Sequence, residues 1–194
     1  MIVTTTTSLP PDYFEQMYVG DPDPWKFETS PYESAKYDAS VKALGQRRYR
    51  RALEVGCANG VLTQRLASYC DELVAIDVSD TALAIARKRN ADTPLINFAR
   101  MMFPHETPNG LFDLIVLSEV VYYWSEADIA TAGAWIADHS KPGGDILLVH
   151  WIGDTDYPQT GDNAVALLRA ALPNVSVIQA DRHEKYRLDL WRRA

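Results

Sequence analysis

Residues 53–60, Leu53-Glu-Val-Gly-Cys-Ala-Asn-Gly60, join a short apolar run to a helical pattern. Gly56, Ala58 and Gly60 stand at alternate positions, where small or absent side chains allow the backbone to turn tightly. Such a turn lets a ligand approach the main-chain N–H groups at the start of the following helix. The stretch therefore predicts a strand, a ligand-binding loop and a helix, in that order.

The chain on both sides of this loop alternates between short apolar runs and helical patterns. Strands separated by helices of roughly 10–14 residues indicate right-handed βαβ units and a parallel sheet. The last two apolar runs are joined by a short turn around Arg182–Lys185, which predicts an antiparallel pair. We expect an α/β, Rossmann-like fold with a seven-stranded, mostly parallel sheet, an antiparallel C-terminal strand and helices on both faces. The predicted strands are 51–55, 72–76, 95–99, 112–117, 145–150, 175–181 and 186–192, and the predicted helices are 31–44, 60–69, 80–90, 126–138 and 161–171.

The composition bounds the class of protein. The chain has 194 residues, of which 47% are hydrophobic and 23% charged, as in an ordinary soluble globular protein. It contains no apolar run of about 18–20 residues, so no membrane span is expected. The first ten residues lack the basic start and apolar run of a signal peptide, which predicts a cytoplasmic protein.

Charge and metal-ligand patterns exclude two further classes. A net charge of −7 argues against nucleic-acid binding, which needs clustered basic residues. One basic cluster precedes the first strand, either as a solvated helix end or to recruit an acidic substrate: Arg47, Arg48, Arg50 and Arg51. Cys57 and Cys70 are too few for a disulfide framework, and the histidines show no ligand spacing with them, so no metal site is expected.

The beginning of the chain forms a separate segment. Residues 1–30 show no clear periodicity but carry several aromatic residues, so we expect them to be ordered from about Asp12. Ser30-Pro-Tyr-Glu33 places an N-cap serine, a proline and a glutamate where a helix starts. We predict an N-terminal segment, 1–30, and a single domain, 31–194.

Asp77 ends the second predicted strand, about 20 residues beyond the loop, where a carboxylate can accept hydrogen bonds from vicinal ribose hydroxyls. The loop and the carboxylate together suit one of two ligands, a dinucleotide or S-adenosyl-L-methionine. The dinucleotide pattern G-x-G-x-x-G fails, because Ala58 and Val61 occupy the second and third glycine positions. Glu54 would repel a pyrophosphate but suits an ammonium group. Electrostatics therefore favours S-adenosyl-L-methionine, with S-adenosyl-L-homocysteine as its product.

The sequence resembles the class I methyltransferases over about residues 50–150. It is most similar to the NodS family, whose members N-methylate a free amino group on a chitooligosaccharide. With the N-terminal segment, the likeness covers roughly residues 20–150. The segments that carry it are Asp23-Pro-Trp25, Pro31-Tyr-Glu33, Leu53-Glu-Val-Gly-Cys-Ala58, Phe112-Asp-Leu-Ile-Val116 and Glu119-Val-Val-Tyr-Tyr123.

The resemblance implies a cofactor site built around the loop. Glu54 would lie near the ammonium group of the cofactor and Asp77 would hold its ribose. The loop residues implied for the methionine part are Gly56, Cys57, Ala58 and Gly60.

Adenine binding departs from the family pattern. Val78 would pack on the adenine. The acidic residue usual after the third strand is missing, because Phe98-Ala-Arg-Met-Met102 stands there. The adenine would then rest on Met101 or Met102 and on main-chain groups.

The N-terminal segment would cover the cofactor site, as it commonly does in such enzymes. Trp25 would cover the methyl-bearing end of the cofactor, and Lys36 would pair with its carboxylate. Packing in the protein core is the competing role for both residues.

Ser118 and Glu119 follow the fourth strand, beside the expected position of the reactive methyl group. Glu119 would orient an amine or collect its proton, unless it caps the next helix. Tyr122 would line the acceptor pocket or belong to the core. His150 ends the fifth strand, with proton transfer or a structural role as alternatives. The Asn/Asp-Pro-Pro-Tyr element of adenine and glutamine N-methyltransferases is absent.

These patterns predict an S-adenosylmethionine-dependent methyltransferase for a small molecule, with N-methylation of an amino sugar or a related amine as the leading hypothesis and an oligosaccharide as a further candidate acceptor. The polar loop at 154–161 suits a sugar or polyol. One alternative is O- or N-methylation of another natural product or metabolite. The other is a non-catalytic, cofactor-binding partner protein. The sequence carries no signal for the oligomeric state.

Overall fold

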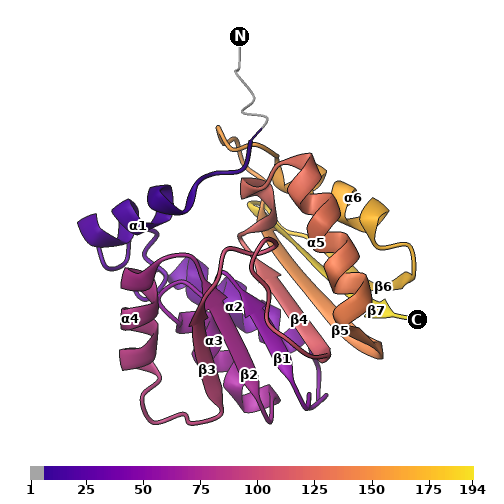
Figure 1. Cartoon of the computed structure of the whole chain (residues 1–194), viewed down its shortest axis with the longest axis horizontal. Coiled ribbons are helices and arrows are strands. Elements are labelled where there is room, and N and C mark those ends of the chain that lie inside the picture. The colour runs from indigo at the N-terminus through magenta and orange to yellow at the C-terminus, as the bar shows by residue number, and fades with distance from the viewer. Residues whose placement is uncertain (1–6) are drawn as a thin grey trace. The chain divides into compact units, whose positions relative to one another are not determined.

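A computed structural model describes residues 7–194, which belong to two compact units. One unit is Pro10–Pro108, and the other comprises residues 7–9 and 109–194. Residues 1–6 of the predicted N-terminal segment lie outside the described residues. The boundary predicted near residue 30 stays a prediction. Figure 1 labels the elements.

The unit Pro10–Pro108 contains three parallel strands in the order β3-β2-β1. Every residue of β1 and β2 is buried, as expected for apolar runs inside a parallel sheet. All three strands lie within a residue or two of the prediction. Their bounds are Ala52–Val55 for β1, Leu73–Asp77 for β2 and Ile96–Arg100 for β3.

The helices of this unit begin where the sequence supplies caps. Ser30 and Ser79 each accept a main-chain N–H in the first turn of the helix that follows. The predicted helix 60–69 is shorter as an α-helix, since its last turn is a 3₁₀ helix, Ala67–Tyr69. The α-helices are α1 Pro11–Gly20, α2 Pro31–Ala43, α3 Val61–Leu66 and α4 Asp80–Arg89.

Helix α1 was not predicted, although Phe14, Met17 and Tyr18 stand at helical spacing, and of its residues only Tyr18 is buried. The carboxylate of Glu15 accepts the hydroxyl of Ser79 at 2.6 Å and that of Thr81 at 2.5 Å. These contacts dock α1 on the start of α4 (Figure 1). A tertiary interaction therefore helps to stabilise this short helix.

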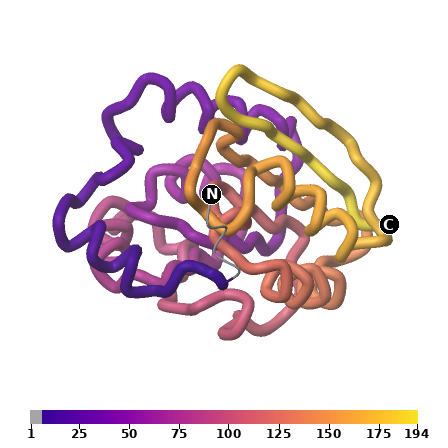
Figure 2. Tube along the Cα trace, turned by 90° about the horizontal axis from the view of Figure 1, so that it is seen from above, coloured from indigo at the N-terminus to yellow at the C-terminus, as the bar shows by residue number. Residues whose placement is uncertain are grey.

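The second unit contains four strands in the order β4-β5-β7-β6. β5 is parallel to β4 and antiparallel to β7, and β6 and β7 form the predicted antiparallel pair. Figure 2 shows this C-terminal pair as two adjacent yellow runs. The residues between 7 and 194 thus contain the seven predicted strands. The four here are β4 Phe112–Ser118, β5 Ser140–Trp151, β6 Val175–Arg182 and β7 Tyr186–Arg193.

Strand β5 begins at Ser140, earlier than the predicted residue 145. The glycine- and proline-rich stretch Lys141-Pro-Gly-Gly144 is typical of a turn. In the structure it is a bulge, with a φ of +71° at Gly143 and a register shift opposite Phe112 and Leu114. The strand therefore continues through residues that locally favour a turn.

Helices α5, Glu126–His139, and α6, Gly161–Ala171, belong to the second unit and begin at the caps Ser125 and Thr160. A 3₁₀ helix, Val121–Tyr123, follows β4. α5 and α6 lie side by side (Figure 1).

Strand β6 is the last strand of the order and contains a bulge. Val177 pairs with Trp191 and Gln179 with Leu190, so Ile178 is the extra residue. As a result the consecutive side chains of Val177 and Ile178 are 52% and 49% exposed.

Ion pairs occupy part of the basic cluster that the sequence revealed. Arg48 Nε lies 2.6 Å from Asp71 Oδ1, and Arg51 Nε lies 3.1 Å from Glu72 Oε1. Because these arginines pair with carboxylates of their own unit, the structure favours a surface role over recruitment of an acidic substrate.

Among residues 7–194, no helix is long and apolar enough to cross a membrane. Within the same range, no group of three or more His, Cys, Asp or Glu residues has the arrangement of a metal site.

The contact between α5 and α6 makes Gly133→Ala a test of the packing. A Cβ at Gly133 would lie 2.4 Å from the Cβ of Ala171, so the helices must separate. We expect a loss of about 1–3 kcal/mol in the free energy of unfolding from this overpacking, measured by urea denaturation. The loss should appear although alanine favours a helix over glycine by about 1 kcal/mol.

Gly20→Ala is the matched control, because a Cβ there meets no atom within 4 Å. Equal stability of the two variants would contradict the packing described for Gly133.

Candidate functional site

The loop after β1 has left-handed backbone at three positions. The φ angle is +75° at Gly56, +52° at Ala58 and +80° at Gly60. Glycine adopts this conformation freely, whereas it costs an alanine roughly 1–2 kcal/mol. The N–H groups of Gly56 and Cys57 both donate to the carbonyl of Ile76, at 2.8 and 3.0 Å. The loop is therefore fastened to β2.

The end of α4 holds the second half of the loop. The carbonyl of Asn59 accepts Arg89 Nε at 2.9 Å, and the carbonyl of Gly60 accepts Asn90 Nδ2 at 3.2 Å. A Cβ at Gly60 would lie 2.8 Å from that same Nδ2. Gly60 is thus required for close packing as well as for the turn that the sequence predicted.

Asp77 links the end of β2 to the loop. Its Oδ2 accepts the N–H of Ala58 and its Oδ1 accepts the N–H of Ser79, both at 2.9 Å. Burial raises the pKa of Asp77, while these hydrogen bonds act in the opposite direction. A carboxylate offers about four lone-pair sites, so both oxygens can accept further hydroxyl donors. The predicted ribose ligand is compatible with this geometry.

Glu54 lies in β1 just before the loop, and its side chain is 1% exposed. Its Oε2 has no hydrogen-bond partner among the described residues. Burial raises the pKa of Glu54 to about 8, and the negative charge of Asp77 adds to the effect. An unsatisfied buried acceptor is costly, so this position favours a cationic donor such as an ammonium group.

Val78, Met101 and Met102 are half-buried, where the sequence predicted contacts with an adenine. The N–H of Met101 donates to the carbonyl of Asp77 at 3.0 Å, and the N–H of Met102 donates to Glu106 Oε2 at 2.8 Å. The first of these bonds keeps Met101 beside the end of β2. Contact with an adenine stays a prediction for all three residues.

The two predicted residues of the N-terminal part have partners inside their own unit. Trp25 is half-buried, stacks on Phe27 with ring centroids 5.6 Å apart and meets Tyr18 edge-on. Lys36 is 2% exposed, and its Nζ lies 2.8 Å from Glu33 Oε2. The packing role left open for both residues is therefore present, and their cofactor contacts stay predictions.

In the second unit, Glu119 directly follows the buried Ser118 at the end of β4. It has a φ of +58°, a left-handed conformation that is uncommon for a residue other than glycine. Its N–H donates to the carbonyl of Val149 at 2.8 Å. Its Oε2 accepts the hydroxyl of Tyr122 at 2.5 Å and the N–H of Trp151 at 2.9 Å. Strained backbone of this kind concentrates at functional sites.

His150 is completely buried. Its Nε2 accepts the main-chain N–H of Val121 at 3.3 Å, and its ring meets that of Tyr122 edge-on at 5.5 Å. An Nε2 that accepts a hydrogen bond belongs to a neutral imidazole with its proton on Nδ1. The geometry favours the structural role over proton transfer.

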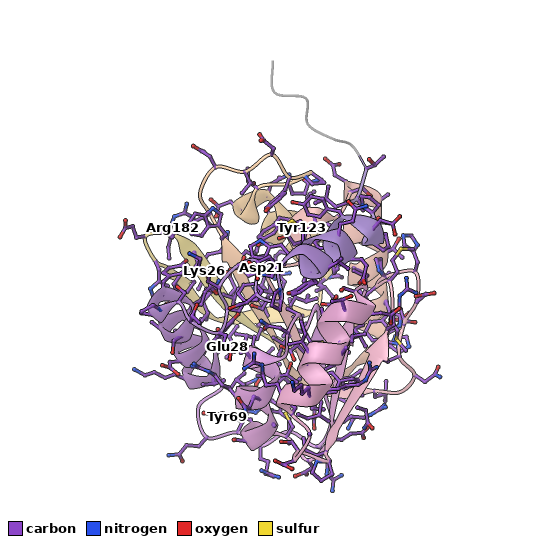
Figure 3. The ribbon with its side chains drawn as sticks, turned by 90° about the vertical axis from the view of Figure 1, so that its left-hand side faces the viewer. Asp21, Lys26, Glu28, Tyr69, Tyr123 and Arg182 are labelled. Atoms are coloured by element: carbon purple, nitrogen blue, oxygen red, sulfur yellow. The ribbon has the colours of Figure 1, made fainter. Side chains whose placement is uncertain are left out.

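A tyrosine cluster next to Glu119 was not predicted in full. The ring of Tyr157 stacks on Tyr122 at 5.4 Å and meets Tyr123 edge-on at 4.7 Å. Tyr123, labelled in Figure 3, and Tyr157 are half-buried, whereas Tyr122 is 5% exposed. Burial raises the pKa values of Tyr122 and Tyr123, so both hydroxyls stay protonated. The only sequence signal for Tyr157 was its place inside the polar loop at 154–161.

The sequence is similar to those of known proteins of one family. The family model of nodulation protein S (NodS) matches residues 14–137. Nodulation protein S of Sinorhizobium fredii is 33% identical over 162 residues, which cover 82% of this chain and 74% of the relative. The Rhizobium tropici protein of the same name is also 33% identical, and the match spans 53% of its length.

Solved structures share the fold across both units. N-methyltransferase NodS from Bradyrhizobium japonicum WM9, in complex with S-adenosyl-L-homocysteine, is 24% identical with a TM-score of 0.82, covering 94% of this chain and 97% of that one. A solved chain from Pseudomonas syringae is 36% identical with a TM-score of 0.74 over 84% of this chain and 99% of its own. The predicted Rossmann-like methyltransferase fold is confirmed.

Glu54→Gln tests the buried carboxyl group. A pKa of about 8, raised from the usual 4.5, means that the folded protein prefers the neutral acid. The stability that this group contributes is complete below the unfolded-state pKa and is lost as the pH rises through 8. We therefore expect the neutral isostere to be more stable than the wild type by about a few kcal/mol at pH near 9, with the difference vanishing toward pH 5.

Urea denaturation at about pH 5, 7 and 9 measures the effect. Glu72→Gln, at a partly exposed surface ion pair, is the control. A stability difference that does not change with pH would rule out the raised pKa of Glu54.

Proposed function

The chain belongs to the NodS family and is an S-adenosylmethionine-dependent methyltransferase, and we propose that it methylates the free amino group of a small acceptor, an amino sugar or a related amine. The observation that carries the cofactor assignment is the buried acceptor of Glu54 beside the glycine loop. The solved NodS of Bradyrhizobium japonicum WM9 is named an N-methyltransferase, which supports the choice of reaction class.

The residues of the loop fit the cofactor by their chemistry. Glu54 offers a desolvated carboxyl oxygen to an ammonium group, and Asp77 offers two oxygens to ribose hydroxyls. The loop N–H groups that are already bonded to Ile76 and Asp77 keep the backbone in place. When bound, S-adenosylmethionine supplies a methyl group already activated on sulfur, so the protein mainly aligns the acceptor and excludes water.

We propose that Glu119 binds the amino group of the acceptor. The hydroxyl of Tyr122 and the N–H of Trp151 both donate to Oε2, which fixes the orientation of the carboxylate. A carboxylate held in this way binds the ammonium form of an amine and accepts its proton, which leaves the nitrogen lone pair available for attack. We assign no step of the reaction to His150, because it is buried and its Nε2 accepts a backbone N–H.

The surroundings of Glu119 support a sugar-like acceptor. Tyr123 and Tyr157 are half-buried, and they combine an apolar ring with a polar hydroxyl. The loop at 154–161 adds hydroxyl, amide and carboxylate side chains. This combination suits a molecule with apolar ring faces and many hydroxyl groups.

A methyl-transfer screen tests the acceptor class. We expect S-adenosyl-L-homocysteine to form with glucosamine or its short oligomers, and not with the N-acetylated forms, because an amide nitrogen lacks a free lone pair. Mass spectrometry of the acceptor and chromatography of the cofactor product measure the reaction. Methylation of the N-acetylated controls at equal rates would indicate attack by oxygen and contradict the proposal.

Glu119→Gln and Tyr122→Phe test the assigned roles. The glutamine keeps a hydrogen-bond acceptor but cannot take a proton, so we expect kcat to fall about 100-fold, the lower range for loss of a general base. The phenylalanine keeps the ring but removes the donor to Oε2, so we expect a loss of about tenfold, typical of a hydrogen bond to a charged group. Steady-state kinetics with a saturating acceptor measures both.

Asp138→Asn, at an exposed position of α5 in the same unit, is the control. If Glu119→Gln turned over at the wild-type rate, Glu119 would have no part in the chemistry.

A further inference from the structure

The Asp-Pro-Trp motif that supports the family resemblance has no role in the function described so far. In the structure the carboxylate of its first residue, Asp23, accepts three hydrogen bonds. Asp23 Oδ1 accepts the N–H of Phe27 at 2.8 Å and Nδ2 of Asn59 at 3.0 Å, and its Oδ2 accepts the N–H of Glu28 at 3.1 Å. Two of these bonds organise the turn at 23–28, and the third reaches the cofactor loop.

Asn59 makes this third bond from a buried position, since its side chain is 1% exposed. It stands between Ala58 and Gly60, two of the three loop residues with left-handed backbone. The direction of its side chain therefore depends on the loop conformation. A buried amide donor that loses its acceptor is destabilising, so the turn and the loop each favour the conformation that keeps the bond.

A second connection between the cofactor loop and the 23–28 turn runs through Arg89 of α4. Arg89 Nε donates to the carbonyl of Asn59 at 2.9 Å, and Arg89 Nη2 donates to Glu28 Oε2 at 2.7 Å. Glu28 is exposed, so this ion pair contributes little by itself. Figure 3 labels Lys26 and Glu28 of this turn, and Asp21 just before it.

The turn fixed in this way carries Trp25, the residue predicted to cover the cofactor. Lys26 has a φ of +58°, and its N–H donates to the carbonyl of Asp23 at 2.9 Å. Phe27, whose N–H also bonds Asp23, stacks on Trp25. The carbonyl and the carboxylate of Asp23 thus accept the N–H groups of the residues that directly follow Trp25, and they hold the turn that carries it.

We propose that Asp23 and Asn59 are a pair of positioning residues that couples the conformation of the cofactor loop to that of the 23–28 turn. The proposal rests on the cofactor function assigned to the loop. Because such coupling is reciprocal, a ligand that stabilises the loop also stabilises the turn, and disruption of the turn weakens ligand binding. Neither residue touches the reacting atoms in this scheme.

Hydrogen exchange of the cofactor-free protein tests the coupling without any ligand. Asn59→Ala removes the amide but leaves the bonds of Asp23 to Phe27 and Glu28 possible. We expect peptides covering residues 23–28 to exchange about tenfold faster than in the wild type, while peptides from β2 stay unchanged. Unchanged exchange in the 23–28 turn would overturn the proposal, because the loop amide would then have no influence there.

Calorimetric titration with S-adenosyl-L-homocysteine tests the consequence for binding. We expect Asp23→Asn and Asn59→Ala each to raise Kd by about tenfold. If they act through their mutual bond, the double variant should bind no more weakly than the weaker single variant. If Asp23 only shapes its own turn, the increases in Kd of the two single variants should multiply in the double variant, which would overturn the coupling.

Asp71→Asn is the control, because Asp71 pairs with Arg48 on the exposed surface of the same unit. It should bind S-adenosyl-L-homocysteine as the wild type does. A wild-type protein that fails to bind at millimolar concentration would refute the cofactor function itself, and the exchange experiment would still decide whether loop and turn are coupled.

Discussion

The carboxylate of Asp77 is the constraint on which the rest of the cofactor loop depends. It receives the N–H of Ala58, a residue whose backbone is left-handed without being glycine, and the N–H of Ser79 at the start of α4. One side chain therefore offsets the energetic cost of the left-handed backbone at Ala58 and connects the loop to the next helix. The hydrogen bonds that hold the loop in this way come from residues of the chain itself.

The acceptor site proposed in the second unit also contains a residue with left-handed backbone. Glu119 is left-handed at the end of a buried strand, and main-chain and side-chain hydrogen bonds hold it there. Glu119 comes directly after β4, and Ala58 comes a few residues after the end of β1. Rigid buried strands thus provide the support that lets individual functional residues adopt unfavourable backbone angles.

Most of the fold was predictable, because buried parallel strands and capped helices leave local signals such as those of β1 and Ser79. The sequence did not reveal α1, which tertiary contacts of Glu15 stabilise, or the early start of β5, where a bulge overrides turn residues. The loop, Glu54 and Asp77 could be assigned as site candidates from spacing and charge. The bond between Asp23 and Asn59 could not, since nothing in the spacing of two distant polar residues indicates that they meet.

The bulge in β6 has a consequence for how the protein behaves among its own copies. An outermost strand with two adjacent exposed apolar residues, Val177 and Ile178, would ordinarily invite another strand to add to the sheet. The extra residue breaks the regular spacing of N–H and carbonyl groups along that strand. A second strand cannot then form a continuous ladder there, so the irregularity protects a hydrophobic edge against edge-to-edge aggregation.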